Sequence, residues 1–284
     1  MGNSNCIIMS KYQGLGNDYL VLDPNKNKVQ LVGKKIELLC KRGFGIGADG
    51  VLFGPILQGG KIGVRIFNPD GGEVEISGNG VRIFAKYLMD QQYVTKKKFA
   101  ITTNHGDVEV ECLNERGTEF RINMGKASFL SDDIPVTGAS REVINEPFTF
   151  NGEMYNATCL SVGNPHCIIM MENVTKETAK AIGPYVESDE HFPHRINLQI
   201  CKVIDKVNLQ IEIYERGAGY TQASGTGSVA AAAAAHRMGL TGPCVNVNQP
   251  GGVIEVEIDE DGTLYMIGSV GFIADISVAE SFFS

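Results

Sequence analysis

The chain has 284 residues, 43% of them hydrophobic and 20% charged, and its net charge is −8. This composition is typical of a globular protein and excludes a largely disordered chain, and the length suffices for one large domain or two medium ones. The acidic balance, in which no run of Lys and Arg exceeds residues 96–98, argues against a nucleic-acid-binding surface.

The seven cysteines are scattered, odd in number and never spaced as CxxC. Neither a zinc cluster nor a redox motif is indicated, and we expect free thiols in a reducing compartment. No apolar run reaches the roughly 18 residues of a membrane-spanning helix, and the opening residues lack the features of a signal peptide. We therefore expect a cytoplasmic protein with no membrane partner.

Alternation of apolar and polar residues predicts strands in both halves of the chain. In chain order the candidate strands are residues 61–67, 105–112, 119–125, 157–162, 167–171, 208–214, 251–258 and 263–268. Helices are fewer, and the candidates are residues 34–41, 78–91, 174–182 and 225–239. The second and fourth of these each begin directly after a Ser-Gly pair, and the fourth is rich in alanine, the best helix former.

An internal repeat organises these elements. Residues 77–80 read SGNG and residues 224–227 read SGTG, so Ser77 and Ser224 lie 147 positions apart. The same spacing separates Asn17 from Asn164, Asn68 from Glu215 and Gly72 from Gly219. Several matches at one spacing indicate a duplicated unit.

The repeat and the strand-rich pattern predict an α+β fold of two pseudo-symmetric halves, each a mostly antiparallel sheet wrapped around one central helix. The polar, Pro- and Gly-containing stretch at residues 127–140 is the natural boundary. We expect halves of 1–130 and 131–271, with the C-terminal strand at 272–284 joining the first half and an active site in the cleft between them.

Each Ser-Gly motif at a helix start is a candidate anion site. Glycine allows the backbone to approach a ligand, and the first N–H groups of a helix together with its dipole favour negative charge. Two such motifs suit one carboxylate, with the two serines on opposite faces of the carbon beside it. The simpler alternative is that each serine only caps its helix.

Long stretches of the chain resemble the diaminopimelate epimerase family and occur in the family's order. They are KYQGLGNDYLVLD, RGFGIGADGVLF, RIFNPDGGEVEISGNGVRIFAKYL, VGNPHC, FPHRINLQI and YERGAGYTQASGTG. The resemblance implies an enzyme of lysine and peptidoglycan biosynthesis that interconverts LL- and meso-diaminopimelate without pyridoxal phosphate or metal. In that family one cysteine thiolate removes the α-proton, and a second cysteine thiol delivers a proton to the opposite face.

The resemblance also assigns roles to individual residues. The family's two cysteines fall on Ser77 and Ser224, and the histidine that helps to poise the first thiol falls on His166. A family glutamine that is often replaced corresponds to Gly50. The implied substrate contacts are Asn17, Asn68, Asn164, Asn197, Glu215 and Arg216, with backbone donors for the reacting carboxylate at Gly78, Asn79, Gly225 and Thr226.

Simpler roles stay open for several of these residues. Glu215 and Arg216 suit the zwitterionic far end of a diamino acid, and the alternative is that they pair with each other as a structural ion pair. Asn17 follows a glycine and has the alternative of a left-handed turn, as asparagines often do. His166 has a structural alternative, and Cys167 is assigned to the core because adjacent strand residues point to opposite faces.

The serines are the one departure from the family that affects the chemistry. A thiol ionises near pH 8.5, roughly, and a helix N-terminus lowers its pKa further, whereas a serine hydroxyl is a far weaker acid. We therefore expect substrate binding with little or no turnover. Three explanations stay open: serines introduced to trap a substrate, a natural binding module, or different chemistry with His166 or Glu215 as base.

The expected function is thus epimerisation of diaminopimelate on a scaffold that lacks its two thiols. The alternatives are a racemase or epimerase of another amino acid and a non-catalytic amino-acid-binding module. A homodimer is compatible with the resemblance. We also expect the two halves to close on the ligand, because a carbanion-like transition state needs water excluded.

Overall fold

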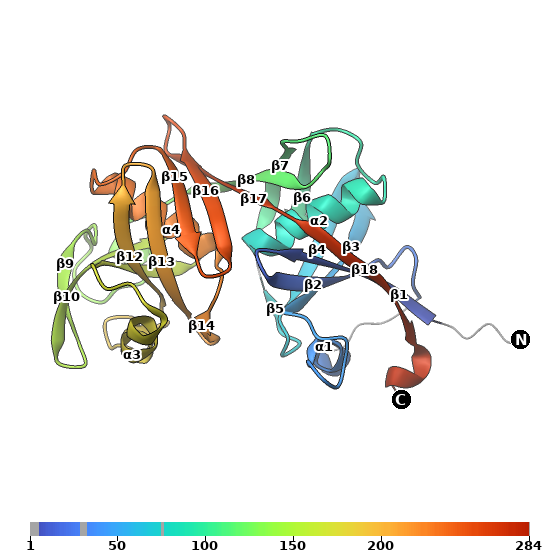
Figure 1. Cartoon of the computed structure of the whole chain (residues 1–284), viewed down its shortest axis with the longest axis horizontal. Coiled ribbons are helices and arrows are strands. Elements are labelled where there is room, and N and C mark those ends of the chain that lie inside the picture. The colour runs from blue at the N-terminus through green and yellow to red at the C-terminus, as the bar shows by residue number, and fades with distance from the viewer. Residues whose placement is uncertain (1–5, 29–32, 75–76, 284) are drawn as a thin grey trace, which may run out of the picture. The chain divides into compact units, whose positions relative to one another are not determined.

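The computed structural model describes residues 6–28, 33–74 and 77–283, so the amino-terminal residues used to argue against a signal peptide lie almost wholly outside it. The chain forms two compact units (Figure 1). The first contains the described residues up to Ile122 together with Gly268 and the residues after it, and the second is Asn123–Ile267. The division into functional halves at 1–130 and 131–271 stays a prediction.

The first unit is a mixed sheet with one long helix. Its strands are β1 (Cys6–Gly14), β2 (Asn17–Leu22), β3 (Gly50–Gln58), β4 (Lys61–Phe67), β5 (Glu73–Val74), β6 (Lys98–Thr103), β7 (Gly106–Cys112) and β18 (Gly271–Ala279), and β8 (Glu119–Lys126) leads out of the unit. The helices are α1 (Gly33–Cys40), α2 (Gly78–Asp90) and the short η2 (Glu280–Phe283). The pairs β2–β3 and β4–β6 are parallel, and the other pairs of neighbouring strands are antiparallel.

The second unit repeats this arrangement. Its strands are β9 (Glu146–Phe150), β10 (Glu153–Ser161), β11 (Pro165–Met170), β12 (Asn197–Asp205), β13 (Asn208–Glu215), β14 (Gly219–Thr221), β15 (Cys244–Gln249) and β16 (Gly252–Ile258), and β17 (Thr263–Ser269) leads out of it. The helices are η1 (Ser131–Asp133), α3 (Lys176–Glu187) and α4 (Gly225–Arg237). The parallel pairs are now β11–β12 and β13–β15, at the places that β2–β3 and β4–β6 occupy in the first unit.

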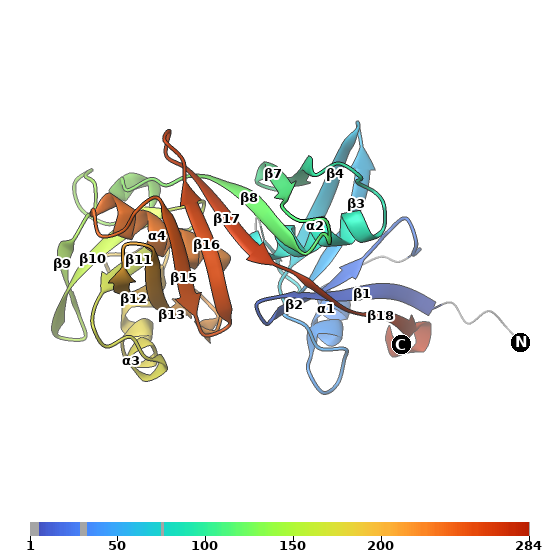
Figure 2. The ribbon, with the colours of Figure 1, turned by 45° about the horizontal axis from the view of Figure 1, so that its top comes forward.

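The predicted duplication is confirmed by this topology. Strands β1 and β10, strands β3 and β12, and helices α2 and α4 are each related by the 147-residue spacing at both ends. The two units differ in where one strand of the sheet comes from in the sequence. The strand beside β10 is β9, its neighbour in sequence, whereas the strand beside β1 is β18, from the far end of the chain (Figures 1 and 2).

The central helices are buried, and most of their residues are apolar or small. In α4 every residue from Gly227 to Ala235 is buried, and its alanines let the surrounding strands approach closely. In α2 the buried residues run from Gly78 to Leu88 and include one charged side chain without a carboxylate partner, Arg82. The α+β fold class expected from the sequence is confirmed.

The expected strands are all present, but the prediction missed β1, β2, β3, β5, β6, β9, β12, β14 and β15. Of these, β2, β3 and β12 each belong to a parallel pair and are largely buried, and their apolar runs do not alternate, so periodicity cannot identify them. The third predicted helix also needs correction. It was expected to end at residue 182, before Gly183 and Pro184, and it continues to Glu187, with Gly183 packed so closely on Tyr214 that a side chain there would collide with the ring.

Candidate active site

Both Ser-Gly motifs form capped helix N-termini with nearly identical geometry. Ser77 precedes α2 with φ −138° and ψ 116°, and its Oγ accepts a 3.1 Å hydrogen bond from the Gly80 N–H. Ser224 precedes α4 with φ −140° and ψ 119°, and its Oγ accepts a 3.2 Å bond from the Gly227 N–H. The capping role and an anion site are compatible, because the cap satisfies only one of the free N–H groups of the first turn.

The surroundings of Ser77 include a phenol that the sequence did not single out. Tyr19, on β2, is buried, and its hydroxyl oxygen lies 3.3 Å from Ser77 Oγ. Tyr19 precedes His166 by the 147-residue spacing, so the two repeats place different polar rings at one position of the fold. Comparing the halves position by position would have shown this exchange.

Ser224 is buried among polar groups of the second unit. Its backbone N–H donates to Gln249 Oε1 at 3.0 Å, and Ser228 Oγ donates to the Ser224 carbonyl at 2.9 Å. Burial raises the pKa of Glu215, while the nearby hydroxyls of Ser224 and Thr221 oppose that rise. The side chains of Glu215 and Ser224 thus lie within hydrogen-bonding reach of each other, and their action on one substrate stays a prediction.

His166 is fully buried between two side-chain amides. Its Nδ1 lies 2.9 Å from Gln199 Oε1, and its Nε2 lies 2.9 Å from Asn164 Oδ1. Burial lowers the pKa of His166 to about 4, so the ring is neutral at physiological pH. A neutral imidazole donates through one nitrogen only. Gln199 Nε2 is otherwise without a hydrogen-bond partner among the described residues, so a reversed Gln199 amide that donates to Nδ1 satisfies both groups.

Asn17 and Asn164 each bond to the residue two places after the serine of their own unit. In the first unit Asn79 Nδ2 donates to Asn17 Oδ1 at 3.3 Å, and Asn17 Nδ2 donates to Asp49 Oδ2 at 3.0 Å. In the second unit Asn164 Nδ2 donates to Thr226 Oγ1 at 3.4 Å. Both contacts span 62 residues, so the repeat extends to individual side-chain hydrogen bonds.

Asn197 braces the turn that carries Arg216. Its Oδ1 accepts from the Arg216 N–H at 2.9 Å, and its Nδ2 donates to the Pro165 carbonyl at 2.8 Å. These bonds use one donor and one acceptor site of a buried side chain, which is 5% exposed. Asn197 therefore has an evident structural role, and its contact with a substrate stays a prediction.

A buried carboxylate holds the same turn from the other side. Glu187 Oε1 accepts a 2.6 Å hydrogen bond from the Gly217 N–H and also pairs with Arg195. The exposed Arg216 donates to the His194 carbonyl at 3.1 Å and, within the described part of the chain, forms no ion pair with Glu215. The structure gives no support to the alternative that Glu215 and Arg216 pair with each other.

Asn68 lies in the matching turn of the first unit. It is exposed, its N–H donates to the Gly72 carbonyl at 2.8 Å, and its carbonyl accepts from the Gly71 N–H at 3.0 Å. The equivalent bond from the Ala218 N–H to the Glu215 carbonyl measures 3.1 Å. Asn68 is thus at least a turn residue whose side chain is free to meet solvent or a ligand.

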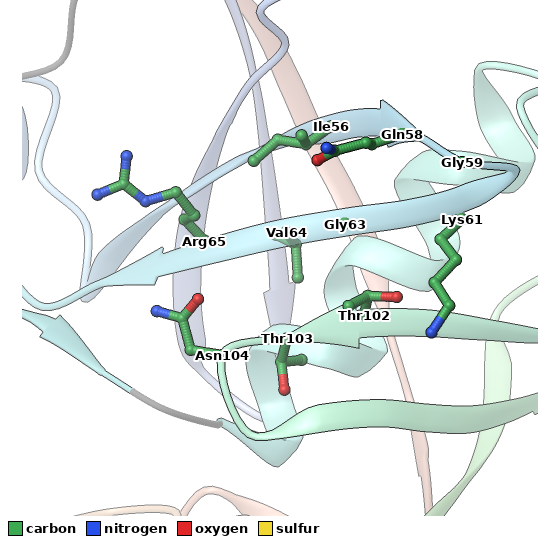
Figure 3. A pocket seen from close by; sticks show the side chains of 10 residues that line it. All are labelled: Ile56, Gln58, Gly59, Lys61, Gly63, Val64, Arg65, Thr102, Thr103 and Asn104. Atoms are coloured by element: carbon green, nitrogen blue, oxygen red, sulfur yellow. The ribbon is translucent and has the colours of Figure 1, made fainter.

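A hollow of about 530 Å³ lies elsewhere in the first unit, between the β3–β4 hairpin and β6 (Figure 3). None of the expected site residues lines it. Its cationic side chains are already paired, Lys61 with Asp107 at 2.7 Å and Arg65 with Glu73 at 2.6 Å. We assign no ligand to this hollow.

Within the described ranges, no group of three or more His, Cys, Asp or Glu side chains is placed to hold a metal ion. No helix in the same ranges is long and apolar enough to cross a membrane.

Similarity to a known family covers most of the chain. The family model for diaminopimelate epimerase matches residues 9–130 and 158–273. The chain is 45% identical to diaminopimelate epimerase 2 of Nostoc sp. PCC 7120, over 96% of this chain and 96% of that protein. It is 38% identical to the diaminopimelate epimerase of Methanothermobacter thermautotrophicus, over 95% of this chain and 97% of that protein.

Solved structures share the fold at low sequence identity. A hydroxyproline epimerase from Agrobacterium vitis superposes with a TM-score of 0.71 at 12% identity, covering 99% of this chain and 94% of that one. A probable proline racemase from Agrobacterium radiobacter gives a TM-score of 0.68 at 14% identity, covering 96% of this chain and 93% of that one.

Proposed function

The chain belongs to the diaminopimelate epimerase family of isomerases, and we propose that it binds diaminopimelate on a scaffold for inversion at one α-carbon. The observation that carries this proposal is the matched pair of capped helix N-termini. Each unit supplies one Gly-rich turn, at Gly78–Asn79 and Gly225–Thr226, whose backbone N–H groups suit a carboxylate.

The same geometry explains why the family's reaction uses thiols at these two positions. An atom at the N-cap accepts from a helix N–H and lies in the positive potential of the helix end, which stabilises a thiolate. In the proposed native reaction one thiolate takes the α-proton and the opposite thiol returns a proton to the other face. The two sulfurs exchange protonation states, and the product differs from the substrate only in configuration.

Ser77 and Ser224 keep the shape of this arrangement but not its acidity. Each serine hydroxyl accepts the cap bond that a thiolate would accept, so the helix ends and the ligand site are preserved. A hydroxyl without an adjacent base is rarely ionised near neutral pH. We infer that this chain binds its ligand while proton exchange is very slow or absent.

The distal residues favour a ligand with a second zwitterionic end. Glu215 is an acceptor for an ammonium group, and Arg216 is able to grip a carboxylate. The turn that carries them is braced by Asn197 and Glu187 through the backbone N–H groups of residues 216 and 217. Preorganised donors and acceptors of this kind reduce the entropy lost on binding.

The decisive experiment is α-proton exchange of LL-diaminopimelate in D2O. We expect no exchange by this chain, and wash-in of deuterium with formation of the meso isomer by a Ser77→Cys/Ser224→Cys variant. A Ser140→Cys/Ser188→Cys variant, with two thiols added at exposed positions, is the matched control and should stay inactive. Exchange by the serine form would mean that another base, His166 or Glu215, carries different chemistry.

Two alternatives are separated by binding measurements. A thermal-shift panel with diaminopimelate, lysine, histidine and proline should show stabilisation by diaminopimelate alone. A comparable response to a monocarboxylic amino acid would favour a racemase of that amino acid. Binding without any exchange after both cysteines are restored would favour a binding module.

A further inference from the structure

Arg82 carries a buried charge, and two of the residues packed around its guanidinium are glycines. Its side chain is fully buried on α2, and burial lowers its pKa to about 10, so it stays protonated at neutral pH. A side chain at Gly268 would lie 2.0 Å from Arg82 Nη1, and one at Gly14 would lie 2.9 Å from Nη2. Two glycines, one on β1 and one on β17, therefore leave the room that the guanidinium occupies.

This guanidinium forms few hydrogen bonds for a buried arginine. Nη2 donates to Asn79 Oδ1 at 2.8 Å, but Nε and Nη1 have no hydrogen-bond partner among the described residues. Buried arginines are normally paired with carboxylates, and an unpaired charge costs stability. A residue that costs stability and has one directed contact is a candidate for a role other than holding the fold.

The contact to Asn79 begins a chain of hydrogen bonds with charged ends. Asn79 Nδ2 donates to Asn17 Oδ1 at 3.3 Å, and Asn17 Nδ2 donates to Asp49 Oδ2 at 3.0 Å. Asp49 Oδ2 also accepts from the Asp18 N–H at 3.0 Å, and Oδ1 accepts from Arg42 at 2.9 Å. An arginine only donates and a carboxylate only accepts, so the two ends dictate which way both amides between them face.

The second unit lacks both ends of this chain. The positions equivalent to Arg82 and Asp49 are Val229 and Ile196, which are buried and apolar. There Asn164 Nδ2 donates to Thr226 in the first turn of α4, and Asn164 Oδ1 lies 2.9 Å from His166 Nε2. Asn17 thus accepts from its helix residue, whereas Asn164 donates to its own.

We propose that Arg82 and Asp49 are positioning residues that lock the Asn17 side chain in one amide orientation for ligand binding. Asn17 uses one N–H and one lone pair within the chain of bonds, which leaves one donor and one acceptor site at fixed places. An amino acid has a carboxylate and an ammonium group that need those two functions in one arrangement. The role of Asn17 as a ligand contact rests on the proposed function.

The test combines ligand binding with the side-chain amide signals of Asn17 and Asn79 in ¹H–¹⁵N NMR spectra of the full chain. Asp49→Asn replaces an acceptor-only end by an amide that fits either orientation, and Arg82→Met removes the donor while filling the space. Lys61→Met is the control, since it removes an exposed cation of the same unit. Thermal unfolding is recorded for every variant.

We expect one set of Asn17 amide signals in the parent and in Lys61→Met, and two exchanging sets in Asp49→Asn and Arg82→Met. Calorimetric affinity for LL-diaminopimelate should fall roughly tenfold in both test variants, the equivalent of about one hydrogen bond to the ligand. Arg82→Met should be no less stable than the parent, because replacing a buried unpaired charge with an apolar side chain is often neutral or stabilising.

Unchanged amide signals and affinity in both test variants would overturn the proposal. A large loss of stability in Arg82→Met with an unchanged Asn17 amide in Asp49→Asn would assign these residues to the fold alone. If the parent does not bind diaminopimelate, the proposed function fails, and the amide signals still decide whether Arg82 and Asp49 orient Asn17. If Arg82→Met does not fold, Asp49→Asn answers the question, because Asp49 is partly exposed and asparagine is nearly isosteric with it.

Discussion

The hydroxyl of Tyr19 lies 3.3 Å from Ser77 Oγ, at the place in the first repeat that His166 occupies in the second. The two ring side chains have different partners. Tyr19 approaches the serine of its own unit, whereas His166 contacts Asn164 and Gln199. The pseudo-symmetric scaffold therefore gives its two serines different surroundings.

Replacing Tyr19 by phenylalanine should remove this contact and leave the helix cap intact. Because the ring stays buried, we expect the free energy of unfolding to fall by only about 1 kcal/mol. In the Ser77→Cys/Ser224→Cys background, the pH profile of proton exchange should shift if the phenol bonds to the group at position 77. Tyr185→Phe, on the exposed surface of α3, is the control. An unchanged pH profile would restrict Tyr19 to packing.

The two serines should contribute to stability as helix caps. Ser77→Ala and Ser224→Ala each remove an acceptor for the N–H three residues on, and each should lower the free energy of unfolding by about 1 kcal/mol. Urea unfolding followed by circular dichroism measures this loss. Ser277→Ala, at an exposed position of β18, should have no measurable effect. No loss at either cap would show that both helix ends are held by other contacts.

His166 should make the protein less stable in mild acid. Its pKa in the folded state is about 4, below the value near 6.5 of an unfolded histidine, so the unfolded chain takes up a proton first as pH falls. The stabilisation is present above pH 6.5, approximately, and roughly 3 kcal/mol is lost as pH falls to about 4.

Urea unfolding at several pH values checks this dependence. His166→Gln should show a smaller decline between pH 7 and pH 5 than the parent, whatever its absolute stability. His236→Gln, which changes an exposed histidine on α4, should keep the parent's decline. Equal declines in the parent and in His166→Gln would mean that the ring is protonated in the folded state.

Glu187 should affect ligand binding without touching the ligand. Glu187→Gln weakens the charge-assisted bond to the Gly217 N–H and the pair with Arg195 that hold the turn of Glu215 and Arg216. We expect affinity for diaminopimelate to fall roughly tenfold, the equivalent of about one hydrogen bond. Titration calorimetry measures it, with the exposed Glu190→Gln as control. Full affinity in Glu187→Gln would show that the turn is held by Asn197 alone.

Features that depend on local sequence were predictable. The 147-residue repeat, the helices after Ser77 and Ser224, and the alternating strands follow from spacing, glycine and apolar periodicity. The capping role of both serines, kept as the simpler alternative, is present in the structure. Strands β2, β3 and β12 escaped because strands buried on both faces have no alternation to detect. Strands β9 and β15 do alternate in burial and were also missed.

The sequence by itself determined the duplicated α+β fold, its two capped helices and the polar residues around them, because these depend on periodicity and on contacts within a few residues. Only the tertiary structure decided the partners of the buried polar groups. Arg82 bonds to Asn79, Asn79 to Asn17 and Asn17 to Asp49, His166 meets Gln199, and the C-terminal strand β18 pairs with β1. The partners depend on which distant segments the sheets bring together. A buried polar group has no water to bond with, so it must form its hydrogen bond with whichever group lies within reach.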